Sequence, residues 1–185
     1  MMARTWRVLQ GRPMKISLEV IKALREKTSA SLNDVRSALE SAHGDESKAL
    51  ELLRARGAEI AQTRQGRSTG QGRVESYVHH DGRLGAIIEV DCETDFVART
   101  PEFVQFCRDV AMHVAAMDPQ YVQLEEAPAR QDAEQLKASC LLEQPFVKDQ
   151  GMTIRTLLQA LIAKTGENVV IRRFARFAVG EPIST

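Results

Sequence analysis

The residues best suited to act on another molecule lie in one short segment, Thr94-Asp95-Phe96-Val97. This segment follows an alternating apolar run, Leu84 to Val90, that is typical of a strand, and a long helical pattern follows it. Thr94 is a good N-cap for a short helix, and Asp95 suits the positive end of that helix. An acid and a large aromatic ring on such a corner suit a wedge that enters a partner protein. The alternative is a helix cap with Phe96 folded into the core, and the residue types alone favour this alternative.

Other reactive side chains lack the spacing that a metal or catalytic site needs. His79, His80 and Asp81 are adjacent at the end of a predicted strand. Neighbouring side chains on a strand point to opposite faces, so a solvated turn is favoured over a metal site. The sequence shows no phosphate-binding loop and no nucleophile–base pair. A binding protein is therefore favoured over an enzyme with its own chemistry, and no cofactor is expected.

The totals describe an ordinary soluble protein. The chain has 185 residues, 43% of them hydrophobic and 27% charged, which fits one or two small globular domains. Its formal net charge is zero, so nothing draws it as a whole to nucleic acid or to an anionic membrane. Its apolar runs fall far short of the roughly 20 residues of a membrane span. Three cysteines without metal-type spacing indicate reduced packing thiols of a cytosol-like compartment: Cys92, Cys107 and Cys140.

The amino-terminal part of the chain consists of a short basic segment and a helical module. Residues 1–14 carry three arginines and no acid, which favours a disordered tail or an upstream start codon over an organellar transit peptide. Residues 15–57 predict three short helices. Ser31 to Asp34 has the form of a capping box, and Gly44 and Gly57 suit helix ends. Such a bundle is too small for a strong core of its own, which is typical of a module that presents a surface to a partner.

Residues 58–73 form a basic linker rich in Gly, Ser, Thr and Gln. A solvated spacer, with a first part that could be helical, is favoured over a contact to RNA or to an acidic protein.

Residues 74–180 predict a mixed domain, followed by a short tail at 181–185. Alternating runs on either side of Asp81-Gly82 predict a hairpin. Amphipathic patterns predict helices from Pro101 to Met117 and from Thr153 to Lys164, with a short helix around Asp132 to Leu142. Leu141 to Val147 is expected to be extended, and the β-rich run Val169 to Val179 is expected to close the sheet. The predicted fold class is therefore α+β, with helices packed on a small antiparallel sheet.

Three segments together resemble translation elongation factor Ts. Ile21 to Thr28 with the two helices after it resembles the amino-terminal module of that family, which is ubiquitin-associated-like. Cys92-Glu93-Thr94-Asp95-Phe96-Val97-Ala98-Arg99 matches the signature of its core domain. Leu141 to Val147 and Gly166 to Phe174 match the carboxy-terminal part of its short form. The chain departs from the family between Ser29 and Asn33, where a glycine-rich turn with two methionines is usual, and it is shorter than most members before Leu141.

The resemblance implies a guanine-nucleotide exchange factor for elongation factor Tu, acting in the cytoplasm or, if residues 1–13 are a transit remnant, in a mitochondrion or plastid. It reverses the preference at the corner: Phe96 becomes the wedge, Asp95 a carboxylate near the partner's magnesium site, and Thr94 and Val97 the residues that hold the corner. It also implies that Arg25, Leu32 and Arg36 grip the partner's nucleotide domain, and that the chain forms a homodimer through the core sheet. The alternative functions are a binding adaptor without exchange activity and, less favoured, an RNA-binding protein.

Overall fold

The computed structural model describes residues 16–28, 30–128 and 132–181, which divide into two compact units at Leu53 and Arg54. The predicted tail at 1–14 lies outside the described residues, and of the predicted tail at 181–185 only Glu181 lies inside them. Within these ranges, no helix has both the length and the apolar content needed to cross a membrane.

The first unit is built from α1 (Leu18–Thr28), α2 (Leu32–Ser41) and the start of α3 (Glu46–Arg64). The predicted cap of α2 is confirmed, since the Ser31 hydroxyl accepts a hydrogen bond from the backbone N–H of Asp34 at 3.1 Å. Leu18, the first residue of α1, stays outside the core, because its side chain is 81% exposed. The small core consists of Ile21, Leu24, Val35, Ala38, Leu39, Ala42, Ala49 and Leu53.

The predicted helix end at Gly57 is wrong, because α3 continues through it to Arg64. A glycine inside a helix costs only about 1 kcal/mol relative to alanine, and Ala58, Ile60 and Ala61 resume the helical sequence. A Cβ at Gly57 would meet the carbonyl oxygen of Gln159 at 4.0 Å, so α3 passes close to the backbone of a later helix.

The second unit contains the predicted antiparallel sheet, with strand order β1-β2-β5. The strands are β1 (Gln71–Val78), β2 (Leu84–Cys92) and β5 (Val169–Ala178). The hairpin turn is held by Asp81, whose carboxylate accepts from the N–H of Arg83, and by Gly82, which has a φ of 68°. The register of β2 with β5 shifts between Glu89 and Val90, where β5 carries one extra residue.

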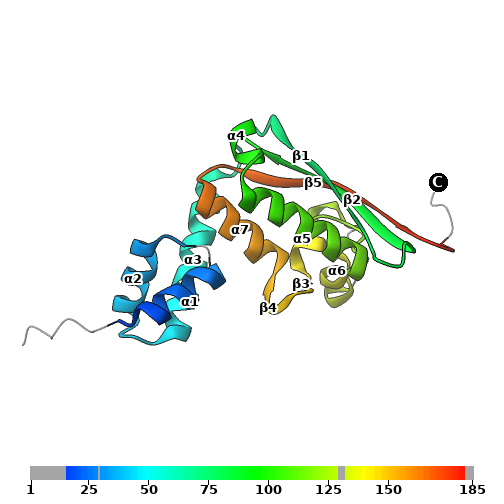
Figure 1. Ribbon diagram of the computed structural model, residues 1–185. Coiled ribbons are helices and arrows are strands. Elements are labelled where there is room, and N and C mark those ends of the chain that lie inside the picture. The colour runs from blue at the N-terminus through cyan, green and yellow to red at the C-terminus, as the bar shows by residue number, and fades with distance from the viewer. Residues whose placement is uncertain (1–15, 29, 129–131, 182–185) are drawn as a thin grey trace, which may run out of the picture. The chain divides into compact units, whose positions relative to one another are not determined.

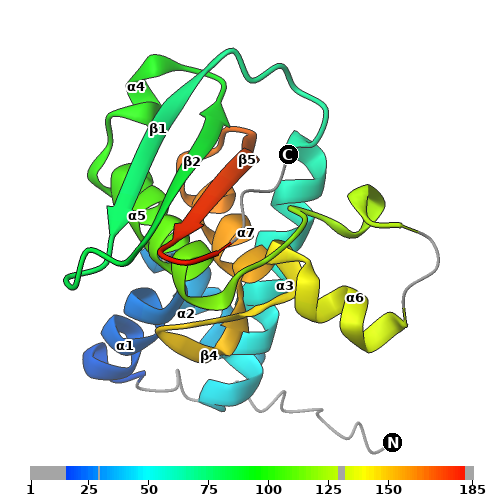
Figure 2. The same cartoon turned by 90° about the vertical axis from the view of Figure 1, so that its right-hand side faces the viewer.

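Two helices lie on the same side of this sheet, α5 (Pro101–Met117) and α7 (Ile154–Thr165), as Figures 1 and 2 show. Each begins at a threonine cap, Thr100 for α5 and Thr153 for α7. Apolar side chains of both helices and of the inward sheet face form one core, including Phe103, Val110, Val114, Ile88, Val90, Ile154, Ile162 and Ile171. The α+β fold class expected from the sequence is confirmed.

The connection between α5 and α7 contains the short helix expected around Asp132 to Leu142, but it differs from the prediction after that helix. It contains η1 (Leu124–Glu126), α6 (Ala133–Ser139), η2 (Leu141–Glu143), β3 (Pro145–Phe146) and β4 (Asp149–Thr153). The expectation of an extended segment from Leu141 to Val147 holds only for the two residues of β3. Leu141 and Leu142 instead form a 3-10 turn, because their N–H groups bond to the carbonyls of Tyr121 and Val122, a partner segment that sequence periodicity does not reveal.

Candidate functional site

The corner that follows β2 forms a separate four-residue helix, α4 (Asp95–Ala98), at one end of the sheet (Figure 1). Thr94 is its N-cap, as predicted, and its hydroxyl accepts from the N–H of Val97 at 3.4 Å. The hydroxyl of Thr100 donates to the carbonyl of Val97 at 2.9 Å and also caps α5. Two threonine caps in close succession therefore keep α4 distinct from α5.

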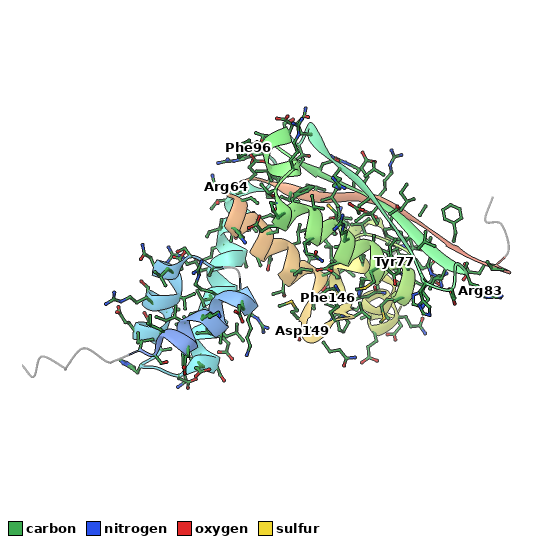
Figure 3. The ribbon with its side chains drawn as sticks, viewed as in Figure 1. Arg64, Tyr77, Arg83, Phe96, Phe146 and Asp149 are labelled. Carbon is green, nitrogen blue, oxygen red and sulfur yellow. The ribbon has the colours of Figure 1, made fainter. Side chains whose placement is uncertain are left out.

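Phe96 points away from the core. Its side chain is 79% exposed, whereas the next two residues, Val97 and Ala98, are 8% and 5% exposed. Figure 3 shows the ring projecting from α4. The interpretation of Phe96 as a buried core residue, which the residue types alone favoured, is therefore wrong. The small apolar pair after Phe96 fills the inner side of the corner and leaves the ring outside.

Asp95 lies in the first turn of α4 and pairs with Arg99, with 2.9 Å between Oδ2 and Nη2. The two side chains are 62% and 80% exposed, so the pair contributes little to stability. The pair keeps the Asp95 carboxylate at the surface of α4, on the residue next to Phe96. Arg99 was not among the predicted site residues, although its i,i+4 spacing from Asp95 is a signal for such a pair.

Two further carboxylates, which were not among the predicted site residues, join the corner to the turn after α7. Glu167, after α7, accepts from the backbone N–H of Thr94 at 3.1 Å and from the Thr94 hydroxyl at 2.6 Å. Glu93 accepts from the backbone N–H of Asn168 at 2.6 Å. Contacts between residues 73 and 75 positions apart leave no periodic signal in the sequence.

The other predicted contact residues lie in the first unit. Arg25 and Arg36 are exposed, and Leu32 is 51% exposed at the first position of α2. Arg36 donates to Glu40 at 3.0 Å, one turn further along α2. These three side chains are accessible, and the structure assigns none of them to the local core.

His79 and His80 were expected to point to opposite faces of a strand, and this expectation is wrong. β1 ends at Val78, so His79 and His80 belong to the turn, where strand alternation no longer applies. Their ring centroids are 4.2 Å apart, and Tyr77 Oη lies 3.0 Å from Nδ1 of His79. Among the residues that the structure describes, no group of three or more His, Cys, Asp or Glu is placed to hold a metal ion.

The three cysteines are free and buried, as predicted. Burial raises the pKa of the Cys92 thiol to about 11 and that of Cys107 to about 12. Thiols with such pKa values stay protonated at neutral pH, so these cysteines act as packing residues and not as nucleophiles.

Comparison with known proteins gives one consistent result. The sequence model of the family described as elongation factor TS matches residues 14–134. The elongation factor Ts of Rubrobacter xylanophilus is 44% identical over 193 residues, covering 89% of this chain and 99% of the relative. The proteins of the same name from Carboxydothermus hydrogenoformans and Fervidobacterium nodosum are 41% and 42% identical, each over 91% of this chain and covering 91% and 100% of the relative.

Proposed function

The chain belongs to the elongation factor Ts family of translation elongation factors, and on this premise we propose that it releases GDP from elongation factor Tu. In this role no bond is made or broken in a site of its own. The protein speeds exchange by binding the nucleotide-free partner more tightly than the GDP-bound partner. The observation that carries the proposal is an exposed aromatic ring, Phe96, on a capped corner whose sequence matches the family signature.

The proposed step is a displacement at the partner's magnesium site. Mg²⁺ requires near-ideal octahedral geometry at about 2.0–2.1 Å, so a small shift of its ligands weakens the bound Mg²⁺–GDP strongly. Phe96 would fill a pocket on the partner as a buried anchor. Asp95, which is exposed on the same short helix and pairs with Arg99, would compete for hydrogen bonds near the metal. Thr94 and Val97 would keep the corner in shape.

The same coupling explains turnover. The factor by which this protein weakens GDP binding equals the factor by which GDP weakens the binding of this protein. Incoming nucleotide therefore releases the exchange factor, and one molecule can act on many partners.

The helical module would contribute to the affinity for elongation factor Tu more than to the rate of GDP release. We propose that Arg25, Leu32 and Arg36 contact the nucleotide domain of elongation factor Tu, since all three side chains are accessible on the first unit. Exposed arginines with a nearby apolar side chain suit a protein interface, where arginine is enriched.

The alternative is a binding adaptor without exchange activity, whose helical module holds a ubiquitin-like or nascent-chain partner. An adaptor has no use for an exposed phenylalanine fixed on a corner of the other unit. RNA binding through the β5 arginines has less support, because Arg172 and Arg173 pair with Asp91 and Glu89 of the neighbouring strand.

Two further parts of the proposal concern assembly and compartment. A second copy of this chain is proposed to cover the sheet, whose β5 is an edge strand. The cytoplasm is the proposed compartment, in keeping with three free thiols.

The deciding experiment is the release of fluorescently labelled GDP from elongation factor Tu with and without this protein. Acceleration that saturates with the concentration of this protein is the expected result. Binding without acceleration would favour the adaptor.

A further inference from the structure

We propose that Glu167 is a positioning residue for the exchange wedge, acting with Glu93 in a reciprocal clamp between the α4 corner and the turn that joins α7 to β5. The proposal rests on the exchange function proposed above, and it adds a residue far from the signature segment. The clamp is defined by four residues: Glu93, Thr94, Glu167 and Asn168.

The contacts of the clamp are reciprocal. Glu167 accepts from both the backbone N–H and the hydroxyl of Thr94, at 3.1 and 2.6 Å. Glu93, directly before Thr94, accepts from the N–H of Asn168, directly after Glu167, at 2.6 Å. Each side of the junction thus provides a carboxylate for a backbone N–H of the other side. Hydrogen bonds to a charged acceptor are among the stronger ones in proteins.

The Glu93 carboxylate and the backbone of Glu167 have further partners. Arg67 lies 3.6 Å from Glu93, between Nη1 and Oε1, and its backbone carbonyl accepts from the Asn168 side chain at 2.9 Å. The backbone N–H of Glu167 donates to the Thr165 hydroxyl at 3.4 Å. The segment before β1 is therefore joined to the same junction.

The turn between α7 and β5, which carries Glu167, is fixed by buried residues on both sides. α7 ends at Gly166 in the left-handed conformation, with a φ of 74°. Ile162 in the last turn of α7 is 5% exposed, and Val169 at the start of β5 is 2% exposed. Glu167 is therefore held between two buried anchor points, and its carboxylate can transmit that rigidity to Thr94.

The corner requires such support because it is too short to be stable alone. α4 has four residues, and forming a single helical turn is unfavourable without tertiary contacts. The Thr94 hydroxyl has two tasks: it donates to Glu167 and accepts from the N–H of Val97. Glu167 thus fixes the orientation of the group that caps α4, and α4 fixes the direction of Phe96. A wedge that is ordered before binding avoids paying the ordering entropy at the interface.

The first test measures the clamp without any partner. Hydrogen–deuterium exchange of peptides covering Thr94 to Arg99 should be about tenfold faster in Glu167→Ala than in the wild type, with β2 and α5 unchanged. Glu167→Gln keeps one acceptor oxygen and should show a smaller increase. The matched control is Glu102→Gln, which removes a different surface ion pair, Lys164–Glu102 at 2.8 Å between α7 and α5, and should leave these peptides unchanged.

The second test measures positioning in exchange. At saturating concentration, Glu167→Ala should lower the stimulated rate of GDP release about three- to tenfold, while Glu102→Gln keeps the wild-type rate. In a Phe96→Ala background, Glu167→Ala should have almost no further effect, because no wedge remains to be positioned. A residue with a merely structural role would lower the rate by the same factor in both backgrounds.

The outcomes separate the two proposals. Wild-type deuterium uptake at Thr94 to Arg99 in Glu167→Ala would overturn the clamp. Faster uptake with an unchanged rate of GDP release would overturn the positioning role. If the wild-type chain itself fails to release GDP, the exchange function fails, and the deuterium comparison still decides whether Glu167 orders the corner.

Discussion

At the scale of single residues, the corner separates a ring that faces solvent from a small apolar pair that faces the core. Phe96 is 79% exposed, and the two residues after it are almost fully buried. An isolated exposed aromatic side chain is not unusual by itself. What distinguishes Phe96 is its rigid mounting, with a threonine cap before it and another after it.

We expect Phe96→Ala to remove most of the exchange stimulation and to leave the fold intact. Truncating a buried interface anchor costs about 2 kcal/mol or more, which corresponds to roughly 30-fold in rate. An exposed side chain contributes little to folding, so thermal unfolding should hardly change. Met117→Ala is a suitable control, because Met117 is 43% exposed at the other end of α5. Early melting of Phe96→Ala would show that the ring supports the core instead.

Asp95→Ala is expected to reduce exchange more at high Mg²⁺ than at low Mg²⁺. If the carboxylate acts by disturbing the metal site, excess metal opposes it and makes its loss more costly. The measurement is the rate of GDP release across a Mg²⁺ titration, with Asp95→Asn as the variant of matched shape. An equal loss at every Mg²⁺ concentration would limit Asp95 to its role in the first turn of α4 and its pair with Arg99.

At the scale of elements, α5 is joined to the end of α6 and to β3 through a buried histidine, His113. His113 is fully buried, and its Nδ1 accepts from the N–H of Val147 at 3.2 Å. The neutral ring then carries its hydrogen on Nε2 and donates to Oε1 of Gln144 at 2.9 Å. Gln144 in turn donates to the carbonyl of Ala138 at 2.6 Å. This network ties α5 to the end of α6 and to β3.

The network predicts a loss of stability in mild acid. Burial lowers the pKa of His113, and the bond to Gln144 opposes this only partly. In the unfolded chain the ring has its ordinary pKa of about 6.5, so below that pH the unfolded state binds the extra proton and is favoured. Stability should be complete above about pH 6.5 and fall as the pH is lowered. Urea unfolding at pH 7.5 and 5.5 should show a smaller drop in the free energy of unfolding for His113→Gln than for the wild type. An identical drop in both proteins would contradict the assignment.

At the scale of the whole molecule, the sheet has one covered face and one open face. The open face carries exposed apolar side chains from all three strands, among them Val74, Val78, Ile87 and Phe177. β5 also leaves one edge of the sheet unpaired. An exposed apolar patch beside an unpaired edge is typical of an interaction surface. β5 carries Arg172, Arg173 and Arg176, and charged side chains on an edge strand disfavour open-ended stacking and favour a closed two-fold contact.

We therefore expect a reversible homodimer. Light scattering across a dilution series should show a mass that falls from twice the chain mass towards 20.6 kDa. Phe177→Arg, which places a charge on the open face, should shift the equilibrium to the monomer, whereas Val147→Arg, at a 39% exposed position outside the sheet, should not. A mass near 20.6 kDa at every concentration would exclude the dimer and leave the exchange mechanism untouched.

The sequence by itself determined the features that depend on residues only a few positions apart, such as turns, helix caps and apolar stripes. The hairpin at Asp81-Gly82, the Thr94 cap of α4 and the apolar stripe of α5 were predicted from the sequence, because their hydrogen bonds and periodicity are local. The signature segment also gave the family, although residue types alone placed Phe96 in the core.

Only the tertiary structure decided which side of the corner faces solvent and what holds it. Val97 and Ala98 pack into the core formed with α5 and the sheet, whereas Phe96 stays exposed. The turn at Leu141 depends on a segment that approaches from elsewhere in the chain. Glu167 meets Thr94 across 73 residues, and a contact of that length is fixed by the packing of α7 and β5 and not by any pattern near either residue.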